Sequence, residues 1–75
     1  MNTHDKAVCL IDTAIKTLAA AKPDLHLVYS NAAYTAANVS HELRAIDSAE
    51  FKQYCERIRH IDARFLGLDQ PGVAP

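Results

Sequence analysis

Glycine is absent from the first 66 residues of the chain, and Pro23 is the one proline in that stretch. Both residue types interrupt helices, glycine through its backbone freedom and proline through its missing N–H group. Alanine, the strongest helix former, occurs 13 times among the 75 residues. A long stretch that is rich in alanine and nearly free of helix breakers predicts an all-α fold.

Two signals near the N-terminal half divide this stretch into helices. Asn2 or Thr3 can accept a hydrogen bond from the first turn of a helix, which predicts a first helix over residues 4–22. Pro23 fits the first turn of a helix, where its missing N–H has no intrahelical partner. We therefore expect a second helix over residues 24–46.

The third helix has a signal at each end. Asp47 is followed three residues later by Glu50, which is the spacing of a capping box. Gly67 can adopt the left-handed conformation that closes many helices. These signals predict a helix over residues 48–66, with a flexible tail at residues 69–75.

Apolar residues in each predicted helix recur at alternating steps of three and four, so each set forms one stripe. The stripes are Val8, Ile11, Ile15 and Leu18; then Leu25, Tyr29, Ala32, Ala36, Val39, Leu43 and Ile46; then Phe51, Tyr54, Ile58, Ile61, Phe65 and Leu68. Short connections make consecutive helices antiparallel neighbours. We expect a single domain over residues 1–68: a small three-helix bundle, or an extended antiparallel helical hairpin with a preceding helix.

The second predicted helix is unusual because residues 25–41, seventeen positions, include no Asp, Glu, Lys or Arg. Two neighbouring helices cannot cover a helix that is apolar or small nearly all round. Beside its stripe we expect an interface with a second copy, or with a different protein, formed by Leu27, Val28, Ala33, Tyr34 and Ala37. The alternative is a central core helix whose outer side is wetted by Ser, Asn and Thr.

The third predicted helix carries a possible basic face, formed by Lys52, Arg57, Arg59, His60 and Arg64. Such a face suits an acidic protein surface or nucleic acid. The chain has a formal charge of -1, however, and residues 48–66 hold four Lys or Arg against three Asp or Glu. Nucleic-acid binding is therefore the second choice.

Residues that carry chemistry are few and scattered. Cys9 and Cys55 form no Cys-x-x-Cys pair, and no two His, or His and Cys, share the spacing that zinc ligands need on one helix. Gly67 and Gly72 come too late for a phosphate-binding loop. We expect no enzyme activity, no metal and no cofactor. A cysteine-based redox or metal module is the third alternative.

The remaining expectations concern location and role. No targeting peptide and no apolar run of membrane-spanning length is found in the sequence, which indicates a cytoplasmic protein without a membrane partner. Small chains without catalytic residues commonly act by covering surfaces. We expect a non-enzymatic homodimeric regulator, adaptor or inhibitor that binds a larger protein, of the kind that phages and mobile elements carry.

Overall fold

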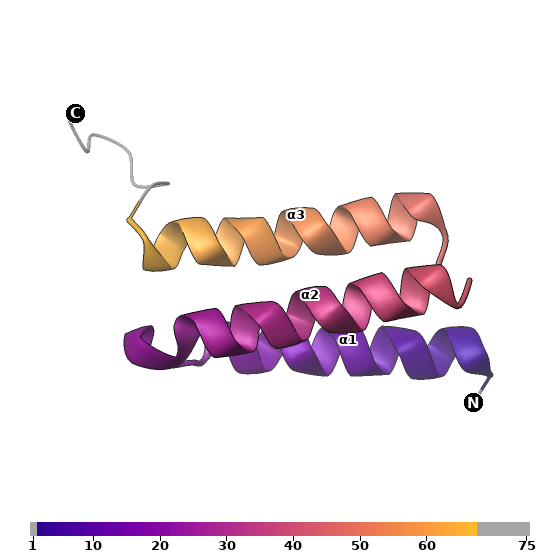
Figure 1. Cartoon of the computed structure of the whole chain (residues 1–75), viewed down its shortest axis with the longest axis horizontal. Helices are drawn as coiled ribbons and strands as arrows, with labels where there is room; N and C mark the ends of the chain where they lie inside the picture. The colour runs from indigo at the N-terminus through magenta and orange to yellow at the C-terminus, as the bar shows by residue number, and fades with distance from the viewer. Residues whose placement is uncertain (1, 68–75) are drawn as a thin grey trace.

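The computed structural model describes residues 2–67, which form three α-helices and contain no strand. The helices are α1 (Thr3–Ala19), α2 (His26–Glu42) and α3 (Ser48–Phe65), and a short 3-10 helix, η1 (Pro23–Leu25), leads into α2. In Figure 1, α2 lies between the other two helices. It packs along both, whereas α1 and α3 contact each other much less. The predicted all-α three-helix bundle is confirmed.

The first two helices are shorter than the sequence pattern predicted. α1 ends at Ala19 instead of residue 22, and the segment from Pro23 begins as η1 before it becomes α2. None of the helices in residues 2–67 has the length and hydropathy needed to cross a membrane. The predicted tail at residues 69–75, like the last apolar position of the third stripe, lies outside the described residues.

The helix ends carry the caps that the sequence predicted. The Asn2 side chain accepts a hydrogen bond from the backbone N–H of Asp5 at 2.8 Å, which caps α1. Asp47 and Glu50 form a complete capping box, because each side chain accepts the backbone N–H of the other. Gly67 follows α3 with a φ of 70°, the left-handed conformation that favours glycine.

α2 ends four residues before the predicted position because the chain makes a left-handed turn. Arg44 has a φ of 60°, and the N–H groups of Arg44 and Ala45 donate to the carbonyls of His41 and Ser40. These two backbone hydrogen bonds form a Schellman motif. The turn brings Ile46 into the core, where its side chain is buried. Burial of this side chain is favourable, and it offsets the strain of a left-handed arginine.

The core stripe of α3 is confirmed over the described residues, and that of α1 is confirmed from Ile11 onward; at the start of α1, Ala7 is buried and Val8 is only half-buried. Ile11, Ile15 and Leu18 of α1 are buried, and so are Tyr54 and Ile58 of α3. The partly buried side chains that pack against this core from α3 are Phe51, Ile61 and Phe65. Both helices are strongly amphipathic, so periodicity identified their inner faces correctly.

The predicted inner face of α2 is wrong. The buried residues are His26, Ser30, Ala33, Ala37 and Ser40, each one position after a member of the predicted stripe. One residue is about 100° of rotation. α2 therefore turns Ala33, Ala37 and small polar side chains inward. Of the predicted stripe, Leu25, Val39 and Leu43 are exposed, Tyr29 and Ala36 are partly buried against the core, and only Ile46, beyond the end of α2, is buried.

This rotation corrects part of the predicted interface. Ala33 and Ala37 are fully buried inside the chain, so they belong to the core and not to an outer surface. Tyr34 is half-buried. Leu27 and Val28 are both exposed, but about 100° of rotation separates them, so they do not lie on one side of the helix as a single interface. The physical reason is size: alanine lets α1 and α3 approach the α2 backbone more closely than leucine or valine would.

We predict that Ile58→Ala lowers the free energy of unfolding by about 2–5 kcal/mol, because a fully buried side chain is replaced by a cavity. Urea titration followed by the helical circular-dichroism signal measures this change. Lys52→Ala, at an exposed position of the same helix, serves as the control and should change stability by less than about 0.5 kcal/mol. Equal effects of the two substitutions would contradict the assigned core.

Candidate functional site

An apolar strip runs along the side of α2 that faces away from the core. We call it the outer face; it consists of Val28, Ala32, Thr35, Val39 and Leu43, all of them exposed. Their spacing of three or four residues places them on one side of the helix. Val28 is 62% exposed, Val39 49% and Leu43 72%. Three large apolar side chains on one uncovered strip form a candidate binding surface.

The outer face is also free of formal charge along most of its length. The stretch from Leu25 to His41 holds no Asp, Glu, Lys or Arg; Asp24 in η1 precedes it and Glu42 at the end of α2 follows it. The exposed surfaces of α1 and α3, in contrast, carry acidic and basic residues of both signs. A partner that covers this strip would therefore not bury any charged side chain along the centre of α2.

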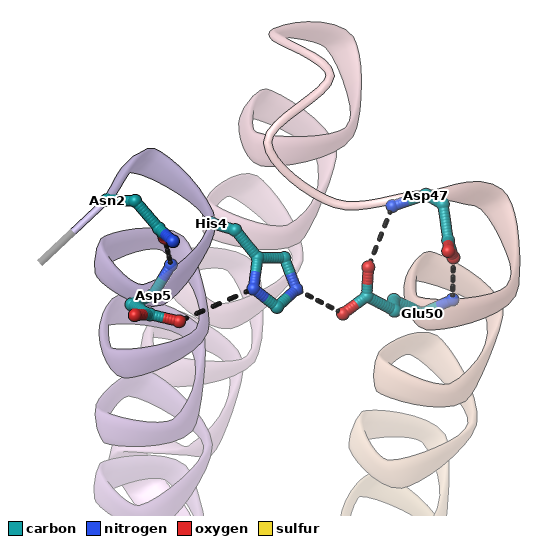
Figure 2. A network of polar contacts seen from close by, with 5 residues as sticks. All are labelled: Asn2, His4, Asp5, Asp47 and Glu50. Carbon is teal, nitrogen blue, oxygen red and sulfur yellow. Dashed lines mark hydrogen bonds and ion pairs between the residues drawn. The ribbon is translucent and has the colours of Figure 1, made fainter.

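A polar cluster joins the start of α3 to the start of α1 (Figure 2). Nε2 of His4 lies 2.6 Å from Oε2 of Glu50, and Nδ1 of His4 lies 3.6 Å from Oδ1 of Asp5. The other carboxylate oxygen of Glu50 accepts the backbone N–H of Asp47. One carboxylate thus caps α3 and holds the N-terminal turn of α1.

This contact shifts the pKa values of both partners. The hydrogen bond and negative charge of Glu50 raise the pKa of His4 above its usual value of 6.5, with a smaller contribution from Asp5. The hydrogen bond from His4, followed by the one from the Asp47 backbone, lowers the pKa of Glu50 below 4.5. Both shifts favour the charged pair, His4 protonated and Glu50 ionised.

Two further histidines hold α3, one near each end. The ring of His41, in the last turn of α2, stacks on Phe51 with centroids 4.5 Å apart, and its Nε2 lies 3.3 Å from the Ser48 hydroxyl. At the other end, the ring of His26 stacks on Phe65 with centroids 4.6 Å apart. Together with His4, these rings fix both ends of α3 to the other helices.

The contact at His26 includes a partly buried hydrogen-bond network. Nε2 of His26 donates to one carboxylate oxygen of Asp62 at 2.6 Å, and the Ser30 hydroxyl donates to the other at 2.9 Å. His26 and Ser30 are both buried, one turn apart on α2. Ser, His and Asp are the residue types of a catalytic triad, but here the carboxylate lies between the other two and His26 is not bonded to Ser30. The network satisfies buried polar groups between α2 and α3.

The sequence analysis did not predict this network. His26 and Ser30 have the spacing of two residues on one helix face, which was visible in the sequence. What the sequence did not contain was the relative register of α2 and α3. The pairing depends on that register, which the core side chains set.

The predicted basic residues do not act as one set. Lys52, Arg57, Arg59, His60 and Arg64 are all exposed on α3. Arg57, however, is bound within the chain: its Nη1 lies 3.0 Å from Oδ1 of Asp12, and its guanidinium lies 5.6 Å from the centre of the Tyr54 ring. This ion pair links α1 to α3, which weakens the case for a phosphate-binding stripe.

The cysteines and the metal alternative find no supporting cluster in residues 2–67. Cys9 is exposed on α1 and Cys55 is half-buried on α3, and neither forms a disulfide. Burial raises the pKa of the Cys55 thiol above 9.0, which opposes thiolate formation. Within the described range, no three His, Cys, Asp or Glu side chains gather as metal ligands would.

An open depression of about 650 Å³ lies beside the turn between α2 and α3. Its lining includes His41, Glu42, Arg44 and Ile46, together with the polar cluster at Glu50. His4 and Glu50 bind each other, and His41 binds α3. Most of these polar groups therefore already serve the fold.

Comparison with protein-family models, curated proteins and solved structures gives no match.

We predict a pH window for the contact between His4 and Glu50. The contribution of the raised His4 pKa is fully present below 6.5 and is lost as the pH rises through the raised value. The contribution of the lowered Glu50 pKa is present above 4.5 and is lost as the pH falls through the lowered value. The pair should therefore be strongest between these two reference values.

The test is a nuclear magnetic resonance titration of the His4 ring in Glu50→Gln, a change that keeps a capping-box residue. The pKa of His4 should fall toward 6.5, and Asp5→Asn should lower it less because Glu50 is the larger cause. An unchanged His4 titration in Glu50→Gln would contradict the contact.

We also predict that Asp62→Ala destabilises the protein by about 1–3 kcal/mol, because it leaves buried donors on His26 and Ser30 without an acceptor. Adding Ser30→Ala to this variant should cost less than Ser30→Ala costs alone, since the hydroxyl has already lost its acceptor. Thermal unfolding of the four proteins measures the coupling. Glu56→Ala, exposed on the same helix, is the control; strictly additive effects would show that no network joins these residues.

Proposed function

We propose that the protein is a non-enzymatic interaction module that pairs with a second copy of itself through the outer face of α2. The observation that carries this proposal is the exposure of Val28, Val39 and Leu43 along one side of the central helix. All five residues of the outer face are exposed, so neither α1 nor α3 covers this strip. Covering it would remove apolar surface from water, which is the main driving force of association.

The absence of charge on the outer face favours a second copy as the occupant. In a two-fold dimer the same surface meets itself, so a charged residue near the axis lies close to its own equivalent and is repelled. The stretch from Leu25 to His41 avoids this cost, because it has no formally charged residue. A charged partner protein would instead be selected by complementary charges, which this strip does not offer.

Association through α2 leaves the exposed sides of α1 and α3 available for a larger protein. This is the basis for a role as a regulator, adaptor or inhibitor. On α3, the cationic side chains of Lys52, Arg59 and Arg64 are exposed and suit an acidic protein surface. Nucleic acid has less support as a partner, since Arg57 is paired with Asp12.

We predict that Leu43→Lys splits the assembly, because it would place a charge in a desolvated apolar contact. Leu27→Glu is the matched control: both leucines are 72% exposed, but Leu27 lies on another side of α2. Each substitution puts its charge at the helix end whose dipole favours it, so both variants should fold. Light-scattering mass at matched concentration reports the result.

Wild type and Leu27→Glu should show twice the chain mass of 8.3 kDa, and Leu43→Lys should approach 8.3 kDa. Circular dichroism of each variant establishes that the helices are intact. A wild-type mass of 8.3 kDa over the accessible concentration range would reject self-association. A dimeric Leu43→Lys beside a monomeric Leu27→Glu would move the interface to another side of α2.

A further inference from the structure

We propose that the two copies pack their α2 helices antiparallel, with the two-fold axis passing between Thr35 and Ala36. This inference rests on the proposed function, because it describes the geometry of the same outer face. It is carried by the positions of the exposed side chains along α2 and by the opposite signs of the helix dipole at the two ends of that helix.

The apolar residues of the outer face are spaced symmetrically. Val28, Ala32, Val39 and Leu43 follow one another at steps of four, seven and four residues. The steps read in the reverse direction are therefore the same, although the residue types differ in order. In an antiparallel pair centred between residues 35 and 36, Val28 lies opposite Leu43 of the partner copy, and Ala32 lies opposite Val39 of the partner copy.

The pairing of Ala32 with Val39 brings a small side chain opposite a large one. Val39 is a β-branched side chain that projects from the helix, and Ala32 leaves a hole of matching position on the opposing strip. A large side chain that faces a small one lets two helices interdigitate closely. In a parallel pair, each residue would face its own equivalent, so Ala32 would meet Ala32 and leave a gap between larger contacts.

The ends of α2 favour the same direction. Glu42 is exposed in the last turn, where the helix dipole is negative. A parallel pair would place the two Glu42 carboxylates and the two negative helix ends side by side. An antiparallel pair places each Glu42 beside the N-terminal end of the partner helix, where the dipole is positive. Thr35, close to the axis, can form a hydrogen bond with its own equivalent.

Disulfide cross-linking tests the direction. In a background of Cys9→Ser and Cys55→Ala, three single variants are made on the outer face: Val28→Cys, Leu43→Cys and Thr35→Cys. A fourth, Leu27→Cys, is an equally exposed control on another side of α2. Each protein is oxidised alone, and Val28→Cys is also oxidised in an equimolar mixture with Leu43→Cys. Cross-linked dimer is measured on a non-reducing gel, and the linked peptides are identified by mass spectrometry.

The expected result is a several-fold higher dimer yield in the mixture than in Val28→Cys or Leu43→Cys alone, with the linked peptides joining position 28 to position 43. Efficient self-linking of Val28→Cys and of Leu43→Cys would overturn the antiparallel geometry and leave the proposed self-association intact. Thr35→Cys lies near the contact in either direction. If it links no better than Leu27→Cys and the wild-type mass is 8.3 kDa, both proposals fail.

Discussion

The close approach of α1 and α3 to the backbone of α2 at Ala33 and Ala37 is the contact on which the rest of the fold depends. Both alanines are fully buried at the centre of the bundle. Their small side chains let the larger core residues of the flanking helices, among them Ile11 and Ile58, fill the space against the middle helix. A single layer of large side chains then suffices for a core, which matters in a chain of 75 residues.

This inward face of α2 also explains the polar contacts at the C-terminal end of α3. Beyond the two alanines, the same face of α2 presents His26 and Ser30, which are buried and must find acceptors. Asp62 supplies them, and Phe65 covers the His26 ring. Hydrogen bonds require a defined geometry, so this network fixes the register of α3 more narrowly than apolar packing alone. The register, in turn, brings the N-terminal turn of α3 beside His4.

The sequence predicted the parts of this structure that depend on local physics. Asn2, the capping box at Asp47 and Gly67 act through bonds to neighbours within a few residues, so they could be recognised directly. The inner faces of α1 and α3 were also clear, since each helix has one apolar side. α2 is apolar or small nearly all round, and its periodicity gave no unique face. The choice between the stripes of Ala32 and Ala33 depends on how closely the flanking helices approach, which is a property of the whole bundle.

The same ambiguity that misled the prediction for α2 has a physical meaning for its role. A helix with one apolar stripe can bury that stripe inside its own bundle. α2 has two apolar sides: the buried side at Ala33 and Ala37, and the exposed side at Val28, Val39 and Leu43. The inner side consists of small residues, so α1 and α3 of the same chain pack closely against it. The outer side carries larger residues at symmetric spacing, which is the basis for the proposed self-association. Because α1 and α3 are already fixed by their contacts with the inner side, a partner can cover the outer side without any rearrangement of the bundle.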